Sequence, residues 1–152
     1  MATTKKTSEG AGFTEAEKAA MKQRAGELKE EKAKKTGRSK KDPLQDVLDA
    51  IAAMEPADRA IAERLHEVIT TAAPSLQSKT WYGFPSYAKD GKVLVFYQPG
   101  AKFGTRYGSL GFNDVAQLDD GNMWPTAYAI AKLTKTMEKD IAALVKRAVG
   151  EG

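Results

Sequence analysis

Aromatic residues are confined to one stretch of this chain. Eleven of the twelve lie between Trp81 and Tyr128, and Phe13 is the exception. The same stretch holds seven of the thirteen glycines and consists of short apolar runs separated by turn residues. Such a pattern is typical of β-strands joined by tight turns. The rest of the chain has the apolar spacing of helices, so we expect helices packed on one aromatic sheet.

Turn residues divide the aromatic stretch into strands. Asp90-Gly91 lies between two apolar runs and is a strong hairpin signal. Residues 93–98 form the most hydrophobic run and are predicted to be the central strand. Because the connections are too short for helical crossovers, the strands should pair mainly antiparallel. The other expected strands span residues 78–82, 84–88, 102–112 and 128–133.

Helices are predicted on both sides of the sheet region. Thr14 and Glu17 have the spacing of a capping box, so a helix should follow to about Lys35. Asp42-Pro43 has the cap-and-proline pattern of a second helix start. The thin apolar stripe of the first helix consists of Ala16, Ala19, Ala20, Met21, Ala25 and Leu28. Further helices are expected at 43–54, 56–71, 113–118 and 136–149, with Thr136 as the cap of the last.

These elements predict an α+β fold. N-terminal helices and a C-terminal helix should pack on a twisted, mainly antiparallel β-sheet. We expect a single domain over residues 42–150, preceded by a basic N-terminal arm over residues 1–41. The arm should contain one helix and be partly disordered, because its ends are polar and rich in small residues.

The charge of the chain is unevenly divided. Residues 1–41 carry twelve Lys or Arg against six Asp or Glu, whereas residues 42–152 carry twelve against fourteen. A nucleic-acid-binding domain usually has a basic surface of its own, so this balance argues against nucleic acid as the partner of the domain. The absence of cysteine excludes disulfides and thiolate chemistry.

No membrane partner is expected. No apolar run approaches the roughly 18 residues of a membrane helix, and the chain start lacks the apolar block of a secretory signal. We therefore expect a cytoplasmic protein. The sequence sets no oligomeric state.

Several motifs follow one another in the order seen in a known bacterial family. A Tyr-Gly-x-Pro sequence occurs at residues 82–85, an apolar strand at 94–97, Met-Trp-Pro at 123–125 and a closing apolar helix at 141–149. Together they resemble the YdhG-like family, a bacterial domain of unknown function, over most of residues 42–150. The resemblance implies an α+β fold and a cytoplasmic protein. Some members are described as frataxin-like iron chaperones, so iron is the metal that the resemblance implies.

Iron binding would need clustered carboxylate or imidazole ligands. The single histidine, His66, lies in a predicted helix where Glu63 shares its face. We interpret His66 as a helix residue rather than a metal ligand. Asp119 and Asp120 could form a weak metal site, although a solvated turn is the simpler interpretation.

Basic and aromatic residues of the sheet are the best candidates for ligand binding. Because side chains alternate between the faces of a strand, Lys102 and Arg106 should share one face. A cleft that joins them to Trp81, Tyr97 and Trp124 could hold a small anionic or aromatic ligand. The alternative interpretation is that the aromatic residues only fill the core. The predicted ligand-binding residues are Lys79, Trp81, Tyr82, Pro85, Tyr97, Lys102, Arg106 and Trp124.

The sequence favours a noncatalytic protein that binds a small ligand or, like an iron chaperone, a metal ion. No serine lies in a nucleophile-elbow context, and the only base for a triad would be His66. No catalytic residue is predicted. The alternative is a nucleic-acid or protein interaction module that uses the basic arm and the aromatic sheet.

Overall fold

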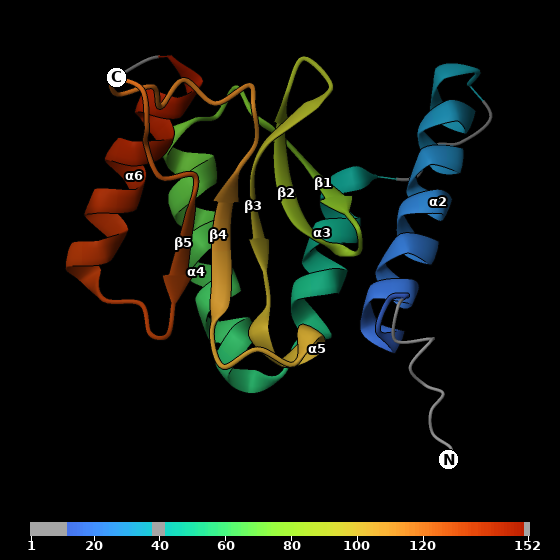
Figure 1. Ribbon diagram of the computed structural model, residues 1–152. Coiled ribbons are helices and arrows are strands. Elements are labelled where there is room, and N and C mark those ends of the chain that lie inside the picture. Colours follow the sequence, from blue (N-terminus) through green and yellow to red (C-terminus); the bar gives the residue numbers. More distant parts are fainter. Residues whose placement is uncertain (1–11, 38–41, 151–152) are drawn as a thin grey trace.

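The computed structural model describes residues 12–37 and 42–150 (Figure 1). Helices pack on a five-stranded sheet, which confirms the predicted α+β class. The expected disorder of the arm concerns residues that lie outside the described ones. The helices are α2 (Glu15–Lys35), α3 (Pro43–Ala52), α4 (Pro56–Ala72), α5 (Gly100–Phe103) and α6 (Lys135–Val149). The strands are β1 (Gln77–Trp81), β2 (Phe84–Lys89), β3 (Lys92–Gln98), β4 (Gly108–Phe112) and β5 (Ala127–Ile130).

The sheet is a simple antiparallel meander. Its strand order is β1-β2-β3-β4-β5, so each strand pairs with its neighbours in the chain. The Asp90-Gly91 turn joins β2 to β3, as predicted, with both residues at positive φ. The register shifts between Tyr87 and Ala88, where one strand carries an extra residue.

One face of the sheet is covered by helices. Figure 1 shows α4 behind the strands, with α3 and α6 on either side of it, and residues of all three helices belong to one core. Tyr87, Val95 and Leu110 face these helices and are at most 1% exposed. They belong to one apolar core together with Leu65 of α4 and Val145 of α6. Burial of this apolar surface is the main force that holds the layers together.

The opposite face carries a second, aromatic cluster. The ring of Phe96 lies 5.1 Å from Trp81 and 5.5 Å from Phe84, measured between centroids. Phe103 of α5 extends the cluster, 6.1 Å from Phe84. Gly111 on the neighbouring strand leaves the space that the Phe96 ring occupies, since a methyl group there would overlap this ring. The aromatic residues are thus divided between the two faces.

Three local predictions are wrong. The strand expected from Lys102 begins only at Gly108, because Pro99 caps the short helix α5 and Gly104, with φ of 72°, ends it. Residues 113–118 form an irregular segment with a turn at 114–115 instead of a helix. The last helix is capped by Thr134 rather than Thr136.

Helix α2 stands beside β1, outside the layer formed by the other long helices (Figure 1). The predicted capping box is present, with Thr14 and Glu17 exchanging hydrogen bonds. Only Ala20 of this helix is buried. Met21 and Leu28 from the predicted stripe are 37% and 51% exposed. The thin apolar stripe predicted from the sequence is therefore mostly exposed and contributes little to the docking of α2.

Candidate ligand-binding site

The turn between β1 and β2 presents two backbone N–H groups at its tip. Tyr82 and Gly83 form this connection, and both have positive φ angles, 55° and 84°. Such a turn matches the twist of a hairpin, and glycine adopts it without strain. The strand ladder ends at the pair of Trp81 and Phe84. The amides of the two turn residues therefore have no acceptor within the strand ladder.

Glu27 of α2 supplies both acceptors. Its Oε1 accepts a hydrogen bond from the amide of Tyr82 at 3.0 Å, and its Oε2 accepts one from Gly83 at 2.9 Å. Arg24 of the same helix donates to Oε1 at 3.3 Å. The Glu27 side chain is only 12% exposed. The carboxylate is thus held through both oxygens in a sheltered contact, where charge-assisted hydrogen bonds are strong.

One turn further along α2, Glu31 binds Lys79 of β1. The Nζ of Lys79 lies 2.7 Å from Oε2 of Glu31, and Arg24 lies 3.4 Å from the same oxygen. Burial raises the pKa of Glu31, but the hydrogen bond and the charge of Lys79 outweigh this effect and hold the pKa below its ordinary value. Helix α2 therefore docks on β1 mainly through charged side chains.

Lys102 of α5 reaches the same region from the other side. Its Nζ donates to Oε1 of Gln23 on α2 at 3.1 Å. A methyl group on Gly83 would lie 2.9 Å from this Nζ, so the ammonium is next to the hairpin turn. Removal of water by neighbouring groups lowers the pKa of Lys102, and the charge of Glu27 opposes this effect in part. Within the described residues, Lys102 forms no salt bridge.

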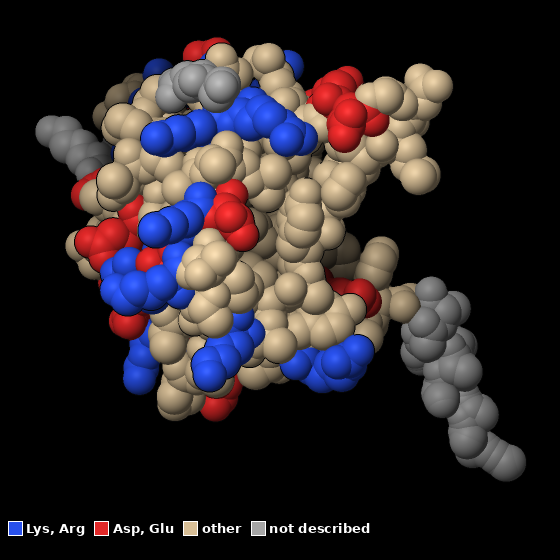
Figure 2. All heavy atoms as spheres, turned by 90° about the vertical axis from the view of Figure 1, so that its left-hand side faces the viewer, with Lys and Arg blue, Asp and Glu red and all other residues tan. Residues whose placement is uncertain are grey.

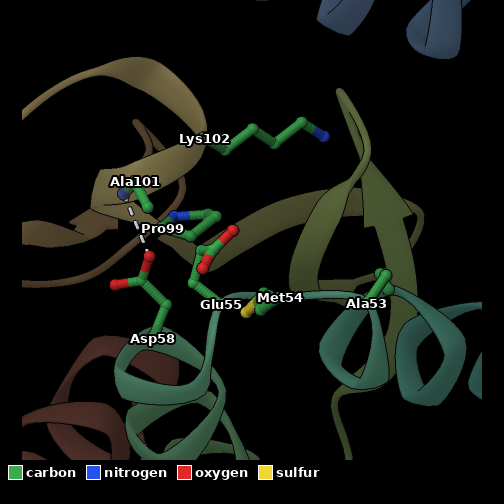
Figure 3. Close-up of a pocket in the computed structure, with 8 residues that line it drawn as sticks. Ala53, Met54, Glu55, Asp58, Pro99, Ala101 and Lys102 are labelled. Carbon is green, nitrogen blue, oxygen red and sulfur yellow. Dashed lines mark hydrogen bonds between the residues drawn. The ribbon is translucent and has the colours of Figure 1, made fainter.

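A hollow of about 300 Å³ lies beneath Lys102, between the α3–α4 junction and α5. Figure 3 shows Lys102 extending across its upper side, while Glu55 points into it from the junction. Met54 and Pro99 provide apolar wall, together with alanines of α3 and α5. The hollow thus combines a cation, a carboxylate and an apolar wall. A second hollow, of about 510 Å³, lies between α2 and α3 and shares Ala50 with the first.

Asp58 at the start of α4 lines this hollow and forms hydrogen bonds to both β3 and α5. Its Oδ2 accepts from the amide of Ala101 at 3.0 Å, the contact drawn in Figure 3. Its Oδ1 accepts from the hydroxyl of Tyr97 at 3.4 Å. Burial raises the pKa of Tyr97, and the negative charge of Asp58 raises it further, so the tyrosine stays a neutral donor. Asp58 therefore fixes α5, and with it Lys102, against α4.

The structure brings together part of the predicted ligand set. Lys79, Tyr82 and Lys102 all contact α2 on one side of the molecule. Their partners on α2 were not among the predicted residues. These partners are Gln23, Glu27 and Glu31. Their spacing of four along a predicted helix was the available signal, since it places them on one face.

The cleft expected between Trp81 and Tyr97 does not form. Tyr97 lies on the helix-covered face, whereas Trp81 contacts Phe96 on the opposite face. Trp124 packs against the main core from the connection between β4 and β5. Arg106 is exposed and lies over the ring of Tyr107, 5.2 Å from its centroid. Pro85 is fully buried.

The predicted metal ligands are not supported by a donor cluster. Asp119 and Asp120 are exposed in the connection that follows β4. Among the described residues, no group of three or more His, Asp or Glu could hold a metal ion. The Nδ1 of His66 lies 2.8 Å from the hydroxyl of Tyr87 instead. The donor set therefore does not fit an iron site.

The surface charge of the α6 side is mixed. Figure 2 shows Lys and Arg side chains on this face with Asp and Glu between them. Arg64 of α4, for example, pairs with Glu67 and with Glu138 of α6. Carboxylates therefore neutralise part of the positive charge on this face. In the part of the chain that the structure describes, no helix has the length and apolar character needed to cross a membrane.

Comparison with known proteins yields no relative. No protein-family model matches the chain, and no curated protein or solved structure matches it either.

Proposed function

We propose that the protein is a noncatalytic binding protein that holds a small zwitterionic molecule, of the amino-acid class, in the hollow between the α3–α4 junction and α5. The observation that carries this proposal is the placement of Lys102 and Glu55 at a single hollow of about 300 Å³. A volume of this size lies at the lower end of the range for small-molecule sites.

The two charges favour a ligand that carries both signs. Lys102 donates to the neutral Gln23, so an anionic group that replaces Gln23 gains a charge-assisted hydrogen bond. Glu55 lies at the other side of the hollow and has no side-chain capping bond of its own at the start of α4. It is placed to accept from the amine of the same ligand. Met54 and Pro99 suit a short apolar side chain.

The remaining lining residues support binding rather than catalysis. The hollow is lined by alanine, methionine, proline, lysine and carboxylates, with no hydroxyl or imidazole among them. Asp58 already accepts two hydrogen bonds from the protein. A metal ion at this place would therefore have Glu55 as its main protein ligand, which is too few for iron.

Isothermal titration calorimetry of the full chain tests the proposal. We expect saturable binding of at least one small amino acid, and none of the corresponding simple amine or simple carboxylate at the same concentration. Fe(II) is titrated in parallel. Saturable iron binding without amino-acid binding would reject the zwitterion and support the iron function that the YdhG-like resemblance implies.

Charge variants locate the site. Lys102→Met and Glu55→Gln should each weaken binding at least about tenfold, because each removes a charged hydrogen bond worth roughly 1.5–3 kcal/mol. Lys92→Met and Glu63→Gln change the same charges at exposed positions outside this hollow and serve as controls. Equal affinity for all four variants would show that the ligand binds elsewhere.

A further inference from the structure

The tip of the β1–β2 hairpin already holds a carboxylate. Both amides of the Tyr82–Gly83 turn donate to the two oxygens of Glu27, at 3.0 and 2.9 Å. Successive backbone N–H groups that converge in this way form anion-binding sites in many proteins, including sites for the carboxylate at a chain terminus. What distinguishes this site is that its occupant belongs to the same chain.

We propose that the Tyr82–Gly83 turn is a binding site for a carboxylate-bearing ligand, and that α2 masks it by placing Glu27 in it. The ligand competes with Glu27 and displaces α2 from the hairpin. This site shares Lys102 with the first hollow, but its two amides do not line that hollow, and the proposal does not depend on a ligand there.

Positive charge on the domain surrounds the masked site. Lys79 binds Glu31, and Lys102 binds Gln23, so the partners of both lysines lie on α2. Departure of α2 removes both partners at once. The hairpin tip then presents backbone amides flanked by two ammonium groups, and Arg24 leaves with its own helix. This arrangement favours an anion over a neutral acceptor.

The glycine of the turn leaves room for the Gln23 side chain of α2 beside the tip. A side chain at Gly83 would overlap Gln23 and would also require an unfavourable φ of 84°. Tyr82, the other turn residue, has its side chain beside Trp81, with the ring centroids 4.9 Å apart. The backbone at the tip is therefore open toward α2 and closed on the aromatic side.

The attachment of α2 suits reversible release. A helix that packs permanently usually buries its apolar stripe. Here Ala20 is the only buried residue of α2, while Met21 and Leu28 are 37% and 51% exposed. Contacts made by charged side chains are weakened by water and by salt. Displacing α2 thus exposes little apolar surface.

Because Glu27 belongs to the same chain, it competes strongly with any outside carboxylate for the two turn amides. A tethered group acts at an effective concentration of order millimolar or higher. An outside carboxylate should therefore bind the wild-type chain weakly and bind much better once Glu27 is removed. The test uses Glu27→Ala in the full chain, with Glu15→Ala as the control on the same helix. Glu15 has a side chain that is 94% exposed and no contact with the hairpin.

The measurement follows the backbone amide signals of Tyr82 and Gly83 by NMR during titration with sodium acetate, with sodium chloride as the salt control. In Glu27→Ala, we expect saturable shifts of both amides, with an apparent affinity for acetate at least about tenfold tighter than in the wild type or Glu15→Ala. Chloride should leave them unchanged. Absence of an acetate response up to 100 mM, about a hundredfold above the millimolar scale, or an equal response to chloride, would overturn the proposal.

Two further arms complete the test. If Glu27→Ala does not fold, Glu27→Gln is used, since it keeps one acceptor oxygen and removes the charge. A short peptide with a free C-terminus and the same peptide with an amidated C-terminus distinguish the source of the carboxylate. Tighter binding of the free peptide than of acetate identifies a chain terminus as the ligand, whereas equal binding identifies a small acid. Binding of the amidated peptide at the same amides would contradict carboxylate recognition.

Discussion

The Nδ1 atom of His66 lies 2.8 Å from the hydroxyl oxygen of Tyr87, at the boundary between α4 and the sheet. Tyr87 is 1% exposed, and burial raises its pKa, so the hydroxyl remains protonated and needs a partner. His66 is half-buried, and this burial lowers its pKa below the ordinary value. The single histidine of the chain therefore contributes to the packing of a core tyrosine.

This contact predicts a pH dependence of stability. A neutral His66 is favoured in the folded state, whereas in the unfolded state it takes up a proton near the ordinary histidine pKa of 6.5. The unfolded state then binds more protons, so the free energy of unfolding should be greatest above pH 6.5 and should decrease as the pH falls below it. Urea unfolding at several pH values measures this decrease. In His66→Gln the slope between about pH 6.5 and 5.5 should be smaller, and an unchanged slope would contradict the assignment.

A carboxylate that joins two elements gives the second prediction. Asp58 accepts from both Tyr97 and Ala101, so its replacement by alanine leaves a buried hydroxyl and a backbone amide without their acceptor. We expect Asp58→Ala to lower the free energy of unfolding by about 1–3 kcal/mol. Asp58→Asn keeps one acceptor oxygen and should lose less. Chemical denaturation of both variants checks the order, and equal losses would show that the charge alone is responsible.

Local interactions were predictable from the sequence, and long-range ones were not. The capping box of Thr14 and Glu17 involves neighbouring residues, so its pattern was sufficient. The separation of Trp81 from Tyr97 depends on strand register across β1, β2 and β3, which no local pattern specifies. The cleft expected between them was therefore wrong, although both residues belong to the sheet region as predicted.

In the candidate site, too, the long-range contacts were not predictable from local sequence patterns. Lys79, Tyr82 and Lys102 were predicted as ligand-binding residues, and the structure places all three against α2. Glu27 was missed because only the thin apolar stripe of α2 was considered, and not the polar residues on its other faces. At α5, residues 102–112 were predicted to form a single strand. Gly104 instead ends a short helix, with a left-handed conformation that a strand would not contain.

Two glycines with opposite surroundings provide the third prediction. Gly111 lies beneath the ring of Phe96, so Gly111→Ala forces this ring to move and should destabilise the protein by about 1–3 kcal/mol. Gly26 lies within α2 and has no neighbouring atom within 4 Å of an added methyl group. Gly26→Ala should therefore stabilise α2, by up to about 1 kcal/mol. Thermal melting and helix content measure the two effects, and a stabilised Gly111→Ala would show that the Phe96 ring has room.

The boundary of the folded domain gives the last prediction. A truncated chain that begins at Asp42 keeps the cap of α3, where the Asp42 carboxylate accepts from the amide of Leu44 at 3.0 Å. It keeps the whole apolar core, because every buried core residue of the main cluster lies beyond position 42. It loses only the polar docking of α2. We therefore expect the truncated chain to melt cooperatively, with a modest decrease in melting temperature. This decrease should become smaller at high salt, because salt screens the ion pairs that the full chain has and the truncated chain lacks.

The amides of Tyr82 and Gly83 should exchange with solvent faster in the truncated chain than in the full chain, since they lose Glu27 as acceptor. Calorimetry and hydrogen exchange check these expectations, and a broad, noncooperative transition would show that α2 is an integral part of the domain.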